Sequence, residues 1–449
     1  MILERMAGST AKNPKRAAMS FIVTMGMVSL FADASYEGAR SILGAYMAHL
    51  GAKPVVVGVV VGGGELLGYL ARAGFGPLAD RTRRYWLLTG AGYVVNLLSI
   101  PAMALARSWA LLAGLVVSER FGKALRTPAR DAMLSKATRL VGEGWGFGVH
   151  EALDQIGAVA GPVGLALVLA SRASYRTGFL WLSIPVALAL IALGVARKLA
   201  ASEEDSEADT ANSMAMAVEV GKDCGRSTEE LEAPKGSSLA QDQSLARDLR
   251  APGEASVPMR ALIRGSFGVY LLATAFSAAG LADFALIAYH AEQKNVVSSA
   301  SIPLVFAAAM AVDGASALGF GRLFDKIGLK ALCLAVVLSA PFAVAAFARD
   351  SRLFVSGVLL WGIGLGAQES IMRSGVATLT PQRLRGSAYG LFGAVFGISW
   401  FLGSALMGYL YGISMVALVV FSVMCESIAA SIIAAVWISK GVNRGPLRP

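Results

Sequence analysis

The chain has 449 residues, of which 55% are hydrophobic and only 16% are charged, and its formal net charge at pH 7 is +10. Soluble globular domains carry about 25% charged residues, so this composition argues against a water-soluble protein. The positive charge does not indicate nucleic acid binding here, because membrane proteins collect Lys and Arg in their cytoplasmic loops.

Apolar segments follow one another along the whole chain, and many are close to the roughly 20 residues that a helix needs to cross a bilayer. The first six are expected at residues 18–49, 54–75, 85–107, 109–127, 147–170 and 177–197. The second six are expected at residues 265–291, 300–320, 328–348, 353–377, 387–411 and 413–438. The sequence therefore predicts an all-α polytopic membrane protein with twelve transmembrane helices. It divides them into two pseudo-symmetric six-helix halves, residues 18–198 and 263–440.

A polar stretch, residues 199–262, separates the two halves. Its biased composition cannot bury enough apolar surface to fold alone, so we predict a flexible linker. Lys and Arg gather in alternate loops, as in the run of Arg81, Arg83 and Arg84. By the positive-inside rule these loops are cytoplasmic, and so are the linker and both tails, residues 1–17 and 441–449. The expected location is the cell inner (plasma) membrane.

Two short motifs repeat at matching positions in the two halves. Residues 74–81 read GFGPLADR and residues 319–326 read GFGRLFDK. Each motif lies between the second and third apolar segments of its half. Such a duplication is a known plan of transporters, with the binding site between the two halves.

With these motifs the chain resembles the major facilitator superfamily, whose loop motif is Gly-x-Leu-Ala-Asp-Arg-x-Gly-Arg-Lys. The resemblance implies a cytoplasmic gate that latches when the opposite side is open. It also places a glycine in a tight turn where a helix leaves the membrane, and Arg83 departs from the motif by replacing its second glycine. The alternative is that these charges only set topology. The predicted gate residues are Gly76, Asp80, Arg81, Arg84, Gly321, Asp325 and Lys326.

The fifth segment contains a run of small residues that resembles the antiporter motif of the same family. Its members here are Gly157, Gly161, Pro162 and Gly164. The fourth segment also resembles a bacterial twelve-helix subgroup that is similar to drug or solute:proton antiporters. The motif of the fifth segment favours export, although close helix packing explains its glycines almost as well. The likeness of the fourth segment sharpens the family without indicating a substrate.

Charged residues inside the first apolar segment are the strongest functional signal. Asp33, Glu37 and Arg40 share one helical stripe, and each would cost about 2.5–3.5 kcal/mol against lipid, so the stripe faces inward. We expect Asp33 or Glu37 to bind and release a proton, with Arg40 modulating that affinity. The competing interpretation is a purely structural network with the fourth helix.

Other intramembrane charges are candidates for a substrate cavity. In the resembled fold the first, fourth, seventh and tenth helices line that cavity, and all four carry charge in this chain. The candidates are Glu119, Lys123, Arg126, Asp154, Asp283, Glu369 and Arg373.

The sequence predicts no metal site and no cofactor. Its three cysteines cannot form a disulfide framework, and none has a Cys or His neighbour at metal-ligand spacing. No nucleophile or extended catalytic loop suggests an enzyme.

We therefore expect a monomeric secondary transporter that works by alternating access. The expected partners are a small-molecule substrate, protons and the lipid bilayer, with no nucleic acid. Proton-coupled antiport that exports an organic solute or drug-like compound is the first hypothesis. A proton symporter importing an organic anion, and a transport-inactive membrane sensor, are the alternatives.

Overall fold

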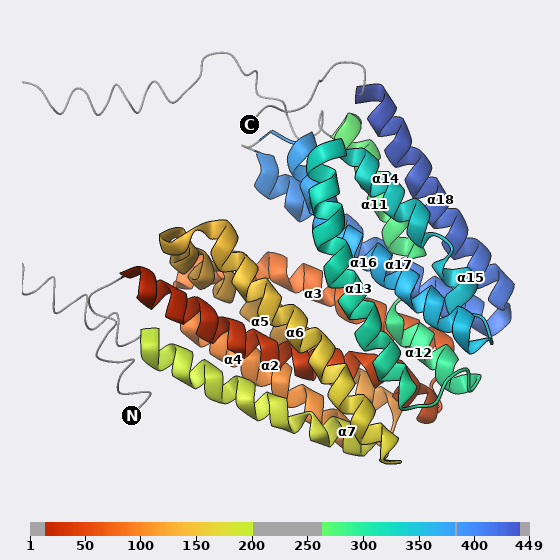
Figure 1. The fold of residues 1–449 in the computed structure, drawn as a ribbon, viewed down its shortest axis with the longest axis horizontal. Helices are drawn as coiled ribbons and strands as arrows, with labels where there is room; N and C mark the ends of the chain where they lie inside the picture. The colour runs from red at the N-terminus through yellow and green to blue at the C-terminus, as the bar shows by residue number, and fades with distance from the viewer. Residues whose placement is uncertain (1–13, 201–262, 382–383, 441–449) are drawn as a thin grey trace, which may run out of the picture.

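In the computed structural model, the described residues are 14–200, 263–381 and 384–440, so most of the predicted linker and tails lies outside them. The N-terminal half is drawn from red to lime green in Figure 1. It comprises α2 (Pro14–His49), α3 (Pro54–Thr82), α4 (Tyr85–Ala102), η2 (Met103–Leu105), α5 (Trp109–Val141), α6 (Glu143–Ala170) and α7 (Tyr175–Trp181), which leads into a helical stretch to Ala200. The C-terminal half comprises α11 (Ser266–Gly280), α12 (Phe284–Gln293), α13 (Ser301–Ile327), α14 (Leu329–Ser339), α15 (Phe342–Ala346), α16 (Ser351–Leu379), α17 (Arg385–Ile413) and α18 (Met415–Lys440).

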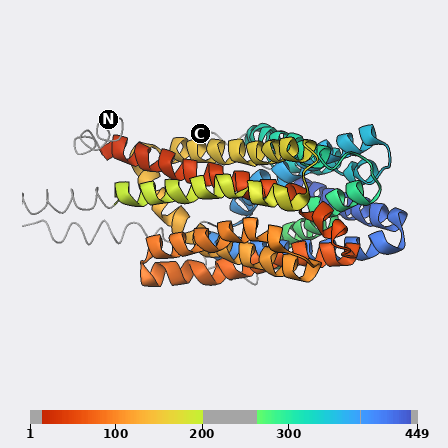
Figure 2. The same cartoon turned by 90° about the horizontal axis from the view of Figure 1, so that it is seen from below.

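These helices account for all twelve expected segments, and the prediction of an all-α fold with two six-helix halves is confirmed. Within the described ranges, ten helical spans are long and apolar enough to cross a membrane. Helix α5 occupies the fourth segment but is not among the ten, because charged residues lower its hydropathy. The ninth segment is a shorter apolar helix, Lys330–Ala346, interrupted before Pro341. Figure 2 shows most helices running lengthwise, as side-by-side membrane helices do.

The outer faces of the bundles are apolar. On the helical stretch that follows α7, Ile184, Leu188 and Ile191 are all at least 41% exposed. They recur every three or four residues, so they form one exposed stripe. A soluble protein rarely leaves such a stripe in water, and here it faces lipid.

The seventh segment is not the single helix that its hydropathy suggested. Helix α11 ends at Gly280 and α12 begins at Phe284, so residues 281–283 lie outside both helices, near the middle of the apolar span. Neighbouring side chains satisfy the exposed carbonyls. Ser422 donates to the carbonyl of Gly280 at 2.7 Å, and Trp361 donates to that of Ala282 at 2.8 Å. A broken helix is tolerated in a membrane only with such partners.

The two halves meet at one end of the molecule and diverge at the other, as the ribbons in Figure 1 show. At the closed end, a Cβ on Gly44 would lie 1.7 Å from the carbonyl oxygen of Ala285, and one on Gly58 would lie 2.1 Å from that of Ser404. At the diverging end, a Cβ added to Gly76 or Gly321 would meet no atom within 4 Å. The conformation is therefore open on the side where α2 begins.

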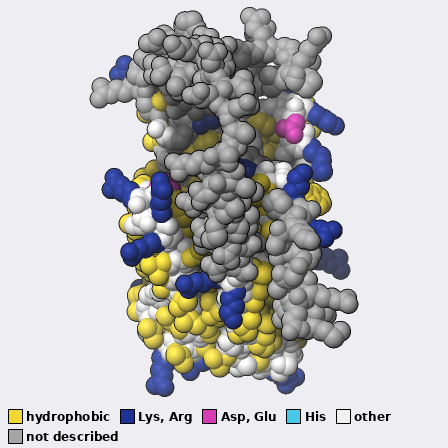
Figure 3. Space-filling view, turned by 90° about the vertical axis from the view of Figure 1, so that its left-hand side faces the viewer, with side chains coloured by type: hydrophobic (Ala, Val, Ile, Leu, Met, Phe, Trp, Pro, Cys, Tyr) yellow, Lys and Arg dark blue, Asp and Glu magenta, His cyan; other side chains and the backbone are white. Residues whose placement is uncertain are grey.

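The repeated motifs lie at this open end, and the structure corrects one detail of them. Gly76 and Gly321 lie inside α3 and α13 and make no turn, because both helices continue past the motif. The turns come later, at Arg83 (φ 52°) and Gly328 (φ 62°). These two positions are equivalent in the repeat, so Arg83 takes the left-handed conformation that glycine adopts in the second copy. Figure 3 views this end, where many Lys and Arg side chains show and few acidic ones do.

Candidate functional site

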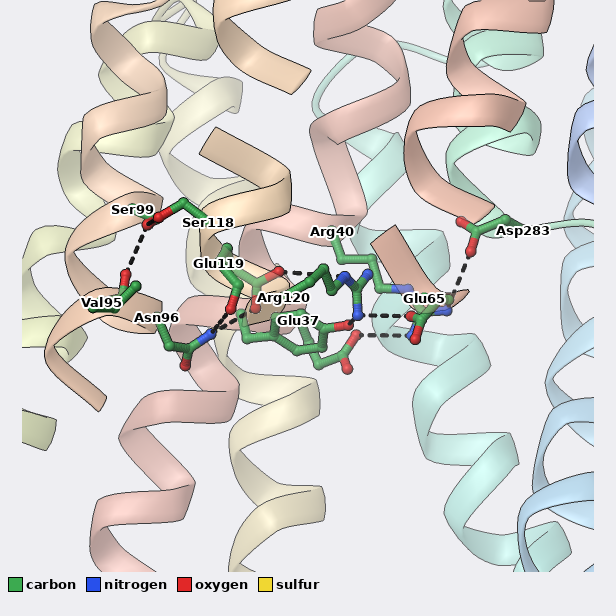
Figure 4. A network of polar contacts seen from close by, with 11 residues as sticks. Glu37, Arg40, Glu65, Val95, Asn96, Ser99, Ser118, Glu119, Arg120 and Asp283 are labelled. Atoms are coloured by element: carbon green, nitrogen blue, oxygen red, sulfur yellow. Dashed lines mark hydrogen bonds and ion pairs between the residues drawn. The ribbon is translucent and has the colours of Figure 1, made fainter. Parts of the chain in front are cut away.

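A buried polar network joins α2, α3, α4 and α5 in the middle of the N-terminal half (Figure 4). Arg120 on α5 lies at its centre, 2.6 Å from Oε1 of Glu65 and 3.3 Å from Oε2 of Glu119. Arg120 also donates to the hydroxyl of Tyr36. The amide of Asn96 donates to Glu119 at 2.6 Å. Two carboxylates thus share one guanidinium, an arrangement that holds charge inside a membrane.

Two further cations on α5 rest on aromatic rings. The ammonium of Lys123 lies 3.6 Å from the centre of the Tyr36 ring, and the guanidinium of Arg126 lies 4.3 Å from that of Tyr93. Lys123 attracts Asp33 and Glu37 electrostatically, although no ion pair forms within the described residues. Helix α5 therefore carries the positive side of the site.

Arg40 links the two halves of the molecule. Its guanidinium lies 3.6 Å from Glu37 on its own helix and 3.8 Å from Asp283 at the break between α11 and α12. Asp283 is 2% exposed and also caps α12, accepting a hydrogen bond from the backbone of Ala285 at 2.9 Å. A small pocket beside Arg40 and Arg120 has room for about one water molecule.

A second cluster lies nearer the open end. Nδ1 of His150 is 3.5 Å from Asp154, and its Nε2 is 3.1 Å from the hydroxyl of Ser29. Arg130 donates to the same Ser29 hydroxyl at 3.3 Å and pairs with Asp131 at 2.9 Å. Asp154 thus belongs to this cluster and makes no contact with the Arg120 network.

The structure brings most of the predicted residues together. Glu37, Arg40, Glu119 and Asp283 lie in or beside this network (Figure 4), Lys123 lies over Tyr36, and Arg126 lies one turn further along α5. Within the described ranges Asp33 makes no hydrogen bond or ion pair with them, and it acts electrostatically on Lys123 and on Asp154 of the second cluster. On α16, Arg373 is exposed, and the side chain of Glu369 lies outside the described residues.

Sequence reasoning missed Arg120 and Tyr36 as site residues. Arg120 is 4% exposed and Tyr36 is also 4% exposed. Arg120 could have been found, since it lies three residues before Lys123 on the already charged α5. Tyr36 carried no separate signal, because aromatic residues are common in membrane helices.

The predicted gate residues are apart in this conformation. Asp80, Arg81, Arg84, Asp325 and Lys326 are exposed at the diverging end. Among the described residues no ion pair joins one motif to the other. Their gating role therefore remains a prediction.

The glycines of the antiporter-like motif lie where α6 crosses α2. A Cβ on Gly157 would lie 2.1 Å from the carbonyl oxygen of Leu30, and one on Gly161 would lie 1.9 Å from that of Ala34. Gly164 packs against Trp181 instead. The first two glycines let α6 press against the helix that carries Asp33 and Glu37.

A side-chain hydrogen bond between the halves closes the end opposite the opening. The hydroxyl of Tyr175 donates to Glu292 on α12 at 2.6 Å. Tyr175→Phe removes this hydrogen bond, which contributes about 0.5–1.5 kcal/mol. The population of the state that is open at the Tyr175 end should therefore rise about 2- to 10-fold. The measurement is the labelling rate of a single cysteine, Leu43→Cys, by an impermeant maleimide in a chain without its native cysteines. Tyr409→Phe, an exposed tyrosine, is the control, and equal labelling rates in the two variants would contradict the prediction.

Comparisons with known proteins agree with this architecture. The model of the Major Facilitator Superfamily matches residues 25–404. The uncharacterized protein Rv2265 of Mycobacterium tuberculosis is 36% identical over 93% of each chain. The uncharacterized MFS-type transporter MJ1317 of Methanocaldococcus jannaschii is 23% identical over 88% of this chain and 89% of its own.

Solved structures share the fold at low sequence identity. A peptide transporter POT, solved in complex with sulfate, superposes with a TM-score of 0.68 at 14% identity and covers 94% of each chain. The nucleoside transporter NupG superposes with a TM-score of 0.69 at 12% identity, over 93% of this chain and all of its own. At such identities the likeness shows the fold alone.

Two six-helix membrane bundles with a polar interior define a multi-pass membrane transporter and not an enzyme. The family match over most of the chain makes the assignment specific: the chain belongs to the major facilitator superfamily.

Proposed function

We propose that this transporter works by alternating access and couples the export of an organic solute to the entry of protons. The observation that carries the proposal is the position of Arg40, which holds Glu37 of one half and Asp283 of the other. Both contacts are longer than 3.5 Å, so neither is a tight ion pair. A change in the angle between the halves would move Asp283 relative to Arg40.

Such a movement would alter the charge that Glu37 experiences. A carboxylate beside a cation stays ionised, and one that loses its cation takes up a proton more readily. Asp33 lies one turn away on the same helix and is attracted by Lys123. The proposed coupling groups are therefore Asp33 and Glu37, with Arg40 as the modulator.

The proposed substrate is a charged or zwitterionic organic compound. Cations on α5 and acids on α2 and α12 give the site both signs of charge, which suits such a solute better than an apolar one. Gly157 and Gly161 pack on α2, which both the antiporter-like motif and ordinary close helix packing require, and export is the direction that the motif favours. Import of an organic anion with protons is the alternative outcome of the test below.

The proposed gate consists of the two motifs at the open end, with Asp80, Arg81 and Arg84 facing Asp325 and Lys326 when the cytoplasmic side closes. The exposure of these residues here supports this role, because the side chains of an open gate are not buried against the other motif. We propose that this end faces the cytoplasm of the cell inner membrane and that the transporter is a monomer. The Lys and Arg at this end support that orientation.

The test measures proton movement in inside-out membrane vesicles that respiration has energised. A pH-sensitive dye reports the gradient while cationic, zwitterionic and anionic compounds are added in turn. We expect one compound class to collapse the gradient in wild-type vesicles. Asp33→Asn or Glu37→Gln should abolish that response, because neither amide can carry the proton.

Glu151→Gln is the matched control, since this glutamate is exposed on α6 and has no place in the proposed mechanism. Its vesicles should respond like the wild type. A wild-type protein that is folded and abundant but silent to the whole panel would exclude proton-coupled export. If an added anion makes the vesicle lumen more acidic, the anion enters the lumen together with protons, and this result would assign import.

A further inference from the structure

A glutamate in the C-terminal half is buried without a counter-ion. Glu426 on α18 is 1% exposed and lies near the middle of its helix. Its Oε2 accepts a hydrogen bond from Ser277 at 3.3 Å, and its Oε1 has no hydrogen-bond partner among the described residues. This carboxyl group lies outside the site described above.

The helices that pack against α18 offer it no positive charge. These helices are α11, α14, α15 and α17. The charged residues that these helices carry are Lys330 and Arg385, in the first turns of α14 and α17, and in the described part of the chain neither forms an ion pair with Glu426. The nearest ionisable neighbour is Cys425 on the same helix, which is neutral as a thiol. An ionised carboxylate here would have no cation to stabilise it.

The hydrogen bonds around Glu426 fit a neutral acid. Gln368 on α16 donates to Ser277 at 2.9 Å, and Ser277 in turn donates to Glu426. The remaining oxygens, Oε1 of Gln368 and Oε1 of Glu426, are buried acceptors without a donor among the described residues. Only one donor, the Ser277 hydroxyl, reaches this carboxyl group in the described part of the chain, which is few for an ionised carboxylate and enough for a neutral acid.

The cluster adjoins the break between α11 and α12. Ser277 lies one turn before the end of α11 at Gly280. Ser422, one turn before Glu426 on α18, donates to the Gly280 carbonyl. Beyond the break, Asp283 contacts Arg40 of the other half. A change in the contact between Asp283 and Arg40 would therefore displace Ser277 and its partner Glu426, because only three residues of non-helical backbone connect Asp283 to α11.

We propose that Glu426 is a proton-binding site of the C-terminal half, occupied in this conformation and emptied when the break between α11 and α12 moves. It is a second proton site, separate from Asp33 and Glu37, and it lies in the C-terminal half. The ligand is a proton, and a sodium ion is the competing occupant that the experiment must separate.

The test is infrared difference spectroscopy on the purified full-length protein, which needs no transported substrate. A protonated glutamate has a carboxylic acid C=O band, and a carboxylate does not. At neutral pH the wild type should show such a band and Glu426→Gln should lack it. The band should disappear reversibly as the pH is raised, on protein that remains folded.

Glu119→Gln is the matched control. Glu119 is 3% exposed, nearly as buried as Glu426, but it faces Arg120. Its replacement should remove no acid band at neutral pH. Glu426→Gln copies the shape of the neutral acid and should fold. If it does not, Glu426→Asp keeps an acid at this position, and the band must then shift from its wild-type frequency.

Three results would overturn the proposal. One is an acid band that is absent from the wild type at neutral pH, because Glu426 would then be ionised. Another is a band that persists at every pH at which the protein is folded, because the proton would be fixed and structural. The last is a band removed by sodium chloride but not by choline chloride at constant pH, which would make this a sodium site. A silent dye assay in vesicles would leave the spectroscopic result standing, so the two proposals fail separately.

Discussion

Gly161→Ala is expected to prevent α2 and α6 from packing and to reduce the yield of folded protein severely. The new Cβ would lie 1.9 Å from the backbone oxygen of Ala34, and backbone cannot move aside as a side chain can. Overpacking of a tight core costs about 1–3 kcal/mol, and here two whole helices must separate. Gly161→Leu should have a larger effect. The measurement is the monodisperse peak and melting temperature of the protein in detergent.

A control on the same helix makes this prediction specific. Gly148 also lies on α6, but a Cβ there would meet no atom within 4 Å. Gly148→Ala should fold at least as well as the wild type, since alanine in a helix interior is more stable than glycine by about 0.5–1 kcal/mol. If Gly161→Ala melted at the wild-type temperature, the close approach of α2 and α6 would be wrong.

Arg120→Met is expected to destabilise the N-terminal half by about 3–5 kcal/mol, the usual effect of breaking a buried ion pair. The substitution removes the only cation that contacts Glu65 and Glu119 in the described part of the chain, and both acids lie inside the bundle. The loss should appear as a lower melting temperature in detergent.

The reason for that loss can be checked by compensation. If the unpaired carboxylates of Glu65 and Glu119 cause the destabilisation, Arg120→Met combined with Glu65→Gln and Glu119→Gln should recover much of the lost stability. Arg352→Met, at an exposed position in the first turn of α16, should melt like the wild type. A triple variant no more stable than Arg120→Met would indicate that Arg120 acts through packing on Tyr36 and not through charge.

The number and order of the helices could be predicted from sequence because hydropathy and length are local properties. The duplication was readable for the same reason, since GFGPLADR and GFGRLFDK are short and contiguous. The break at residues 281–283 was not, because Leu281 and Ala282 are ordinary apolar residues. What permits it is a set of distant donors, Ser422 and Trp361.

The candidate site could be predicted only in part. The stripe of Asp33, Glu37 and Arg40 follows from helical geometry, and the structure keeps these residues on one helix. Which acid pairs with which base is a tertiary property. Nothing in the sequence ties Glu65 to Arg120, or Asp283 to Arg40, because these contacts depend on how α2, α3, α5 and the broken helix pack.

The pairing of buried charges also bears on how membrane voltage acts on this protein. An electric potential of 100 mV does about 2.3 kcal/mol of work on each elementary charge that crosses it. In the Arg120 network and in the pair of Arg40 with Glu37, acids and bases of the N-terminal half lie within 4 Å of one another, so they would move together if the halves rocked. Opposite charges moving together contribute little net work. The voltage dependence of turnover will therefore report chiefly the charge of the bound solute and protons.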